Sequence, residues 1–244
     1  MFLYTGLEIS FWAGVLPSCV GFTVLLGDTR KSVMGLASVM VSVGSMTGGL
    51  LLITCKNMVS RVGQSTIVYL WKIKFRTYTG CPKNWESHKI KYFLYLGRVP
   101  VILFGIVCHM SAYVMCGLVL PHMSPLGDTD QVPLVTPSLW SLLTLSLLMG
   151  LGDAAFNTQV ISLVSSQYKD NSSQAFALVK LVQSVGVSAG FAVSSVIGLH
   201  WQLVVLVTSA LTGSLGFFLV ERRSKNKEIT SWFDVILFIC LSQI

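Results

Sequence analysis

The sequence is short of charged residues, which make up 11% of its 244 residues. An average soluble domain is about a quarter charged, so these charges are too few to cover a water-facing surface. A hydrophobic fraction of 53% excludes a disordered chain. The six cysteines are scattered and never spaced as Cys-x-x-Cys, which excludes a small disulfide-stapled module, and the glycines have no collagen-like triplet period. The class that remains is an integral membrane protein.

Enzymatic motifs are also missing. The sequence has no His-Glu-x-x-His zinc motif, no Gly-x-Ser-x-Gly nucleophile elbow and no Walker phosphate loop. It therefore predicts no catalytic residue, no metal site and no cofactor, and we do not expect the protein to be an enzyme.

Apolar runs long enough to cross a bilayer are present instead. A hydrocarbon core about 30 Å thick needs around 20 helical residues. Six runs meet this length, and they predict an all-α polytopic membrane protein with transmembrane helices at about 3–26, 33–55, 99–121, 139–164, 174–198 and 201–220. No basic segment or cleavage site precedes Tyr4, so we expect the first run to be a retained helix and not a signal peptide.

The basic residues are distributed unevenly between the loops. With six crossings, both termini lie on the same side as segments 56–98 and 222–227, which hold most of the Lys and Arg. Only Arg30 and Lys31 fall on the opposite side. The positive-inside rule therefore predicts that both termini are cytosolic. The net charge of +7 is then explained by the anionic cytosolic leaflet, and no nucleic-acid partner is expected. The glycosylation sequon at Asn171 would be cytosolic and unmodified.

A packing motif occurs twice along the chain. Ser-Val-Gly-x-x-x-Gly appears in the second and fifth runs, with its glycines at Gly44, Gly48, Gly186 and Gly190. The first and fourth runs each carry Gly-Leu beside an acidic residue, Glu8 in one and Asp153 in the other. Because three crossings separate the copies, the sequence predicts a 3+3 inverted repeat. Each motif alone is a common close-packing pattern of membrane helices, and we expect these glycines to pack helices.

Polar side chains within the runs are the candidates for function, since charges at membrane depth are costly. The residues expected to bind a solute or couple a proton are Asp153, Asn157, Lys180, Gln183 and Glu8. Asp153 and Asn157 share a helix face because they lie four residues apart. The helical rise places Lys180 nearer in depth to Asn157 than to Asp153.

The alternative is that these polar groups only join helices by hydrogen bonds. We weigh the two interpretations equally for Asp153 and favour the second for Gln159 and His109. Glu8 is expected near the cytosolic end of its helix, where it can reach headgroup water.

Four segments together carry a family resemblance. They are Tyr4-Thr5-Gly6-Leu7-Glu8 with Ser10-Phe11-Trp12, Gly150-Leu151-Gly152-Asp153 with Phe156-Asn157-Thr158-Gln159, Ala175-Phe176-Ala177 with Lys180 and Gln183-Ser184, and His200-Trp201-Gln202-Leu203. The chain resembles the uncoordinated-93-like branch of the major facilitator superfamily over about 3–63 and 98–221. This resemblance implies the C-terminal six helices of a twelve-helix parent fold, in a group also described as ion channel regulatory proteins.

The same resemblance implies a cytosolic loop motif of the form Arg-x-Gly-Arg after the second helix. Here Arg61-Val62-Gly63 is followed by Gln64, and Arg98 completes the motif only if residues 64–97 are removed. We therefore expect a bundle over 1–221 that is interrupted by an insertion at 64–97. The alternative is a genuine interfacial segment, since this stretch is basic and aromatic. Residues 222–244 are expected to form a basic tail whose apolar end is too short to span.

Taken together, these features predict a multi-pass membrane protein whose six helices form half of a solute transporter. Such a half is incomplete alone, because alternating access rocks one half against another. The expected partners are the lipid bilayer and either a missing N-terminal half or a second copy of the chain. The alternative function is a non-transporting regulatory or trafficking subunit that binds a channel or receptor.

Overall fold

The computed structural model describes the backbone of residues 1–74, 98–168 and 171–241, and the side chains of 1–54, 98–168 and 171–223. Within these residues the regular elements are all helical, which confirms the predicted all-α class. In chain order they are α1 (Phe2–Ser10), the π-helix η1 (Phe11–Val15), α2 (Leu16–Phe22), the 3-10 helix η2 (Val24–Thr29), α3 (Arg30–Lys74), α5 (Arg98–Val119), α6 (Leu139–Gln167), α7 (Ser172–Ser194) and α8 (Leu199–Leu241).

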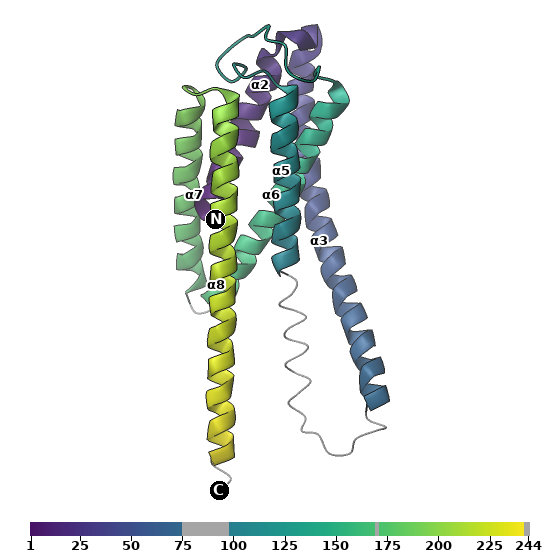
Figure 1. Cartoon of the computed structure of the whole chain (residues 1–244), viewed down its shortest axis with the longest axis vertical. Helices are drawn as coiled ribbons and strands as arrows, with labels where there is room; N and C mark the ends of the chain where they lie inside the picture. The colour runs from purple at the N-terminus through teal and green to yellow at the C-terminus, as the bar shows by residue number, and fades with distance from the viewer. Residues whose placement is uncertain (75–97, 169–170, 242–244) are drawn as a thin grey trace.

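Five helical stretches in the described residues are long and apolar enough to cross a membrane. They are Val24–Thr54, Arg98–Val119, Leu139–Gln167, Ser172–Ser194 and Leu199–Arg223. These stretches overlap the second to sixth predicted runs. They run up and down along the long axis of the molecule, with α6 crossing obliquely behind α5 (Figure 1). The multi-pass membrane character expected from composition is therefore confirmed.

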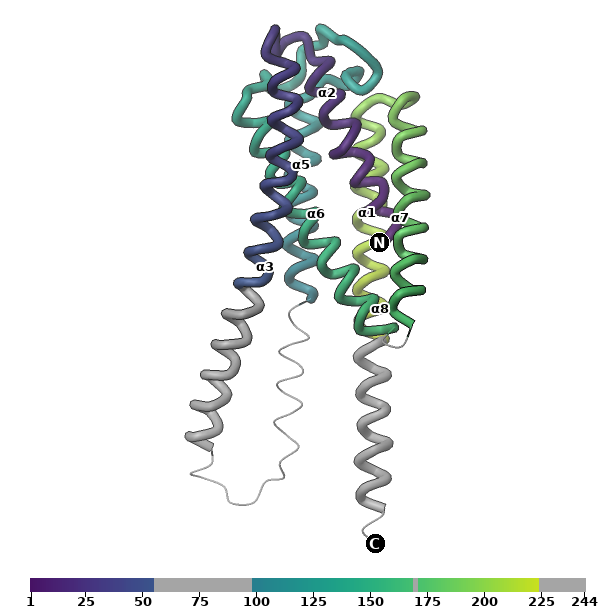
Figure 2. Tube along the Cα trace, turned by 180° about the vertical axis from the view of Figure 1, so that it is seen from behind, coloured from purple at the N-terminus to yellow at the C-terminus, as the bar shows by residue number. Residues whose placement is uncertain are grey.

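The first predicted run, 3–26, differs from a single α-helix. It consists of α1, the wider π-helical turn η1, and α2, and it begins partway along the bundle (Figure 2). The break has a local cause in Pro17, which lies in the first turn of α2 and has no N–H to donate to the preceding turn. A wider turn accommodates the missing hydrogen bond. The chain then reverses at η2, where Gly27 adopts a positive φ of 61°.

Helix packing divides the bundle into two contact groups. Helix α6 packs along α3 and α5, whereas α1 packs along α7 and also contacts α8. Helices α5 and α8 contact each other and close the arrangement. The largest hydrophobic cluster joins both groups, and its buried side chains include Phe11, Leu16, Tyr113, Leu142 and Met149.

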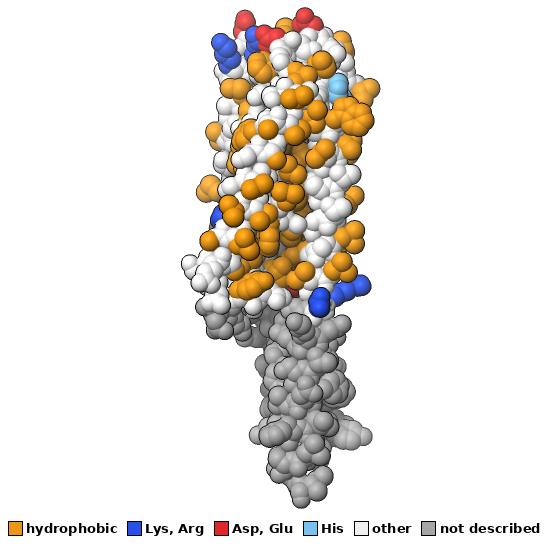
Figure 3. All heavy atoms as spheres, turned by 90° about the vertical axis from the view of Figure 1, so that its left-hand side faces the viewer, with side chains coloured by type: hydrophobic (Ala, Val, Ile, Leu, Met, Phe, Trp, Pro, Cys, Tyr) orange, Lys and Arg blue, Asp and Glu red, His pale blue; other side chains and the backbone are white. Residues whose placement is uncertain are grey.

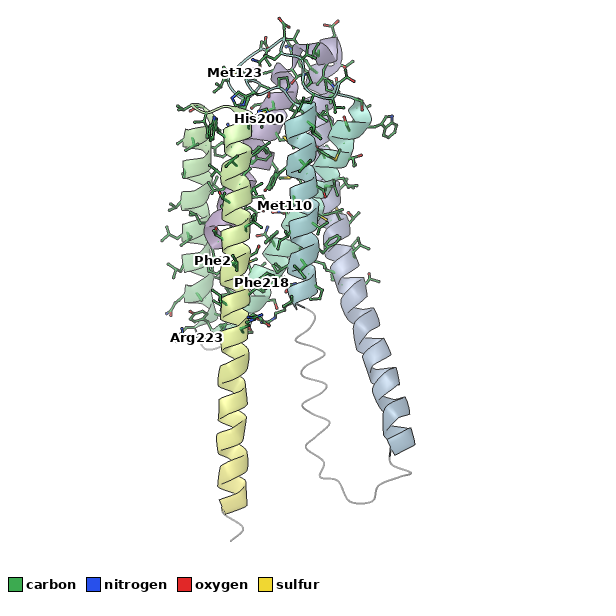
Figure 4. The ribbon with its side chains drawn as sticks, viewed as in Figure 1. Phe2, Met110, Met123, His200, Phe218 and Arg223 are labelled. Atoms are coloured by element: carbon green, nitrogen blue, oxygen red, sulfur yellow. The ribbon has the colours of Figure 1, made fainter. Side chains whose placement is uncertain are left out.

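One end of the bundle, which we call the loop end, holds the connection 120–138 and the turn between α7 and α8. The connection is tied to the end of α2, because the N–H of Thr129 donates to the carbonyl oxygen of Phe22 at 3.0 Å. Arg30 and Asp128 form an exposed ion pair at 2.9 Å. Met123 and His200 lie at this end, and Arg223 lies at the other (Figure 4).

The opposite end, which we call the basic end, holds Arg98, Arg222 and Arg223. Charged side chains gather at the two ends, and hydrophobic side chains cover the band between them (Figure 3). At the basic end the guanidinium of Arg98 donates to the Glu221 carboxylate at 3.3 Å, which joins the start of α5 to α8. The side chain of Glu221 is 2% exposed.

Several sequence predictions fall outside the described side chains. Arg61 and Gly63 of the predicted loop motif lie in the distal part of α3, where only the backbone is described. The predicted insertion 64–97 lies beyond the described side chains along its whole length, as does the tail after Arg223.

Candidate functional site

The glycines of the first packing motif lie where α3 crosses α6. A Cβ on Gly44 would collide with the carbonyl oxygen of Leu147 and would lie 3.1 Å from the Cα of Gly150. Gly150 in turn faces the backbone of α3, so each glycine is needed for the close approach of the other helix. One turn further along α3, a Cβ on Gly48 would come within 2.9 Å of the Ala154 side chain. The absence of side chains lets the two backbones touch.

The second packing motif lies where α7 crosses α1. A Cβ on Gly186 would lie 2.7 Å from the carbonyl oxygen of Leu3 and 3.2 Å from the Cα of Gly6. Gly6 faces the backbone of α7 in the same way. Gly190, one turn along α7, is covered by the side chain of Ser10.

Asp153 lies beside the α3–α6 crossing, in a group that we call the Asp153 cluster (Asp153, Asn157 and Ser45). The side-chain amide of Asn157 donates to Oδ1 of Asp153 at 2.7 Å. The Ser45 hydroxyl on α3 lies 3.4 Å from Oδ2 and 3.2 Å from the carbonyl oxygen of Gly150. The pairing of Asp153 with Asn157 follows the four-residue spacing noted in the sequence. The carboxylate therefore receives hydrogen bonds from neutral donors.

Lys180 and Gln183 form a separate group with Thr5, the Lys180 cluster. The ammonium of Lys180 donates to Oε1 of Gln183 at 2.7 Å, and the Gln183 amide lies 3.4 Å from the Thr5 hydroxyl on α1. Lys180 therefore bonds to Gln183 of its own helix and not to Asn157, which the sequence places at a similar depth. The reason is packing: α7 lies mainly along α1, so its polar side chains turn towards α1 and not α6.

Glu8 occupies a different place from the one expected at headgroup depth. Its side chain is 0% exposed, and Oε1 lies 2.9 Å from Nε2 of His109, which is also 0% exposed. Neither carboxylate oxygen has a hydrogen bond of good geometry among the described residues. Nε2 also lies 3.3 Å from the carbonyl oxygen of Met149. The pairing brings an acid from α1 against an imidazole from α5 in the interior of the bundle.

Two tyrosines complete this group, which we call the Glu8 cluster (Glu8, His109, Tyr4 and Tyr113). The Tyr4 hydroxyl lies 2.5 Å from Nδ1 of His109 and 3.1 Å from the Tyr113 hydroxyl. The imidazole stacks on Phe156, with ring centroids 5.1 Å apart and planes inclined by 7°. Nδ1 of His109 is therefore paired with a phenol, and Nε2 is paired with the carbonyl oxygen of Met149 beside the Glu8 carboxylate.

His109 was expected to join helices, and its partner was not foreseen because the two residues lie on different helices and far apart in sequence. A signal was present in the motif Gly150-Leu151-Gly152-Asp153. A Cβ on Gly152 would collide with Cδ2 and Nε2 of His109, so this glycine makes room for the ring. Gln159, the other expected joining residue, is 7% exposed, and its Oε1 has no hydrogen bond among the described residues.

Comparisons with known proteins identify the group to which the chain is related. It matches the family described as "Ion channel regulatory protein UNC-93" over residues 1–79 and 87–218. It is 34% identical over 221 residues to the UNC93-like protein MFSD11 of Xenopus laevis, and 33% identical over 221 residues to that of Xenopus tropicalis. Each match covers 89% of this chain but only 42% of the relative, and no solved structure matches. The resemblance seen in the sequence motifs is thus confirmed, and the chain belongs to the UNC-93 family.

Proposed function

We propose that the chain is half of a major-facilitator-like solute transporter, built from six helices as a 3+3 inverted repeat. In this arrangement the run α1–η1–α2, α3 and α5 form the first unit, and α6, α7 and α8 form the second. The two units run in opposite directions, because the first helix of one leads towards the loop end and that of the other leads away from it (Figure 2). Inverted units of this kind are a common basis of transporters.

The matching helix crossings support the repeat. In the first unit Gly6 faces Gly186 of α7, and in the second unit Gly150 faces Gly44 of α3. The next turns correspond as well, since Gly190 is covered by Ser10 where Gly48 is covered by Ala154. The contacts between helices correspond in the same way. The contact of α1 with α7 in one unit matches that of α6 with α3, and the contact of α1 with α8 matches that of α6 with α5. A chance recurrence of one Gly-x-x-x-Gly motif would not produce matched partners on both sides.

The observation that carries the transport proposal is the environment of Asp153. This half-buried carboxylate sits among apolar helices and is held by the neutral groups of Asn157 and Ser45. Among the described residues, the cationic side chains of Arg30 and Arg98 pair with other acids, and Lys180 bonds to Gln183. An acid at membrane depth with neutral partners is costly unless it faces a cavity or a ligand. We infer that Asp153 and Asn157, with the Lys180 cluster, line one side of a solute path.

Cysteine labelling tests this path without knowledge of the solute. In a background that lacks the native cysteines, Asn157→Cys should react faster with a cationic methanethiosulfonate reagent than with an anionic one, because Asp153 is adjacent. Adding Asp153→Asn should remove that preference. Val107→Cys, which is highly exposed on the apolar surface of α5, is the control and should react slowly with both reagents. If Asn157→Cys is as unreactive as the control, there is no aqueous path at this position.

A second candidate function is a regulatory subunit without transport activity. The description of the matched family, an ion channel regulatory protein, favours it. In that case the polar clusters hold the helices together, and Asp153→Asn should leave association with a channel subunit unchanged. Co-purification of channel subunits with the tagged chain from its native membrane measures this association. Loss of solute uptake in Asp153→Asn would favour the transporter, whereas channel association that persists in Asp153→Asn, with no solute uptake by the wild type, would favour the subunit.

A further inference from the structure

We propose that the Glu8 cluster is an intramembrane binding site for one exchangeable proton. The side chains of Glu8 and His109 are both 0% exposed, and Oε1 of Glu8 lies 2.9 Å from Nε2 of His109. Charged groups lose their hydration when they are buried, and a buried ion pair offsets this desolvation cost only if it is well hydrogen-bonded. Yet both oxygens of Glu8 lack a well-directed hydrogen bond among the described residues. A proton on the acid removes the buried charge.

The proton positions follow from the heavy atoms. In the loaded state Glu8 is a neutral carboxylic acid, and a small rotation of the imidazole away from the carbonyl oxygen of Met149 lets Nε2 accept from its O–H. The Nδ1–H of His109 then donates to the Tyr4 oxygen, and the Tyr4 O–H donates to the Tyr113 oxygen at 3.1 Å. Every polar hydrogen of the chain Glu8–His109–Tyr4 has an acceptor in this state, and no formal charge is buried.

Release of the proton reverses each of these bonds, and the imidazole turns back so that Nε2–H donates to the carbonyl oxygen of Met149. The Glu8 proton moves to Nε2, the Nδ1 proton moves to the Tyr4 oxygen, and the Tyr4 proton moves to the Tyr113 oxygen, whose original proton leaves. One proton has then left, and Glu8 is a carboxylate whose Oε1 lies 2.9 Å from Nε2. Either hydroxyl of the tyrosine pair can be the donor, which is what a reversible relay requires.

The titratable groups facing the cluster come from three helices. Tyr4 and Glu8 are on α1, Tyr113 is on α5 beside His109, and Asp153 on α6 is close enough to act electrostatically on the imidazole. Gly152 fixes the imidazole against α6, because any side chain there would occupy the position of the ring. The proposed proton site therefore depends on the packing of α6 against the imidazole as well as on the acid and the base. It does not depend on whether the chain transports a solute.

Infrared difference spectroscopy of the purified full chain in lipid nanodiscs tests the proposal. Between alkaline and acidic buffer the wild type should gain, beside the bands of its other titrating carboxyl groups, the C=O stretching band of a protonated Glu8, and ¹³C-labelling of glutamate carboxyl groups should shift it. Glu8→Gln should abolish the band. His109→Gln should also abolish the pH-dependent change, because a buried acid without its base keeps its proton throughout. Asp153→Asn and Glu221→Gln should retain the Glu8 band, which separates this site from the proposed solute path.

Matched glycine variants check that the result arises at the cluster. Gly152→Ala should displace the imidazole and reproduce His109→Gln, whereas Gly49→Ala, where a Cβ meets nothing within 4 Å, should behave as wild type. A glutamate difference spectrum that is unchanged in both Glu8→Gln and His109→Gln would overturn the proposal. A change driven by sodium at constant pH would overturn it in favour of a metal cation.

Discussion

Single residues decide how closely the helices approach. At the α3–α6 crossing the backbones meet at Gly44 and Gly150, and the neighbouring atom is a carbonyl oxygen that cannot rotate out of the way. A flexible side chain at the same distance would simply adopt another rotamer. The tolerance of each glycine to substitution therefore depends on what it faces, and not on the motif that contains it.

Gly44→Ala is expected to lower the free energy of unfolding by about 1–3 kcal/mol, because overpacking against a backbone forces the helices apart. Gly49→Ala is the control, since its Cβ would meet nothing within 4 Å. It should be neutral or stabilising by up to about 1 kcal/mol through helix propensity. A thiol-reactive dye can follow unfolding in detergent, because Cys19, Cys108 and Cys116 are buried in the folded chain. Equal losses in the two variants would contradict the close approach at Gly44.

The sequence predicted the packing glycines and the Asp153–Asn157 pair because both depend on spacing within one helix. It did not predict that Lys180 and Gln183 bond towards Thr5, or that Glu8 meets His109. Those pairs depend on which helices become neighbours and on how they are rotated. A single sequence gives the depth of a residue along its helix, but depth alone does not choose between the surrounding helices.

At the scale of elements, the π-helical turn between α1 and α2 lets the buried residues of both helices face the interior of the bundle. Tyr4 and Glu8 lie before the π-helical turn and Leu16 and Cys19 lie after it, and all four are buried. A π-helical turn holds one residue more than an α-helical turn needs, so it shifts the buried face. Apolar composition predicted a helix here. It could not predict the shift, which arises from Pro17 and from packing on both sides.

Removing the extra residue should therefore be tolerated. We expect deletion of Ala13, an exposed residue of η1, combined with Pro17→Ala to give a regular helix that keeps both buried faces. Deletion of Ser18 with the same proline substitution should rotate the following residues by about 100° and destabilise the chain strongly. Thermal unfolding of the two deletions against Pro17→Ala alone provides the comparison. Lower stability for the Ala13 deletion than for the Ser18 deletion would argue against a register role.

The two ion pairs between elements should contribute unequally to the free energy of unfolding. Glu221 on α8 is 2% exposed and pairs with Arg98 of α5, whereas Asp128 is 60% exposed and pairs with Arg30. We expect Glu221→Gln to destabilise the chain by about 1.5–3 kcal/mol, because the charge-assisted hydrogen bond from Arg98 to the buried carboxylate is lost. Asp128→Asn should change stability by at most about 1 kcal/mol. The dye-based unfolding assay measures both variants, and a larger effect at Asp128 would contradict the assigned burial.

For the whole molecule, composition was sufficient to predict a helical membrane bundle because lipid accepts only elements that satisfy their own backbone hydrogen bonds. The long apolar stretches of α3, α5, α6, α7 and α8 follow from that constraint. The interrupted first run does not, since its α1, η1 and α2 segments are each shorter than a span. The proposed relation between the two units rests on the repeated glycines together with the helix crossings at which they lie.

The orientation of the whole bundle is the remaining prediction, and it follows from charge. The basic end carries Arg98, Arg222 and Arg223, so we expect it to face the cytosol. In sealed microsomes with the cytosolic face outward, a membrane-impermeant maleimide should label Arg222→Cys in a cysteine-free background. Leu134→Cys, which replaces an 81% exposed residue at the loop end, should be labelled only after detergent is added.

The sequon at Asn171, close to the basic end, should carry no glycan. Labelling of Leu134→Cys alone in sealed vesicles, or a glycan at Asn171, would reverse the topology and place the Arg98–Glu221 pair on the luminal side.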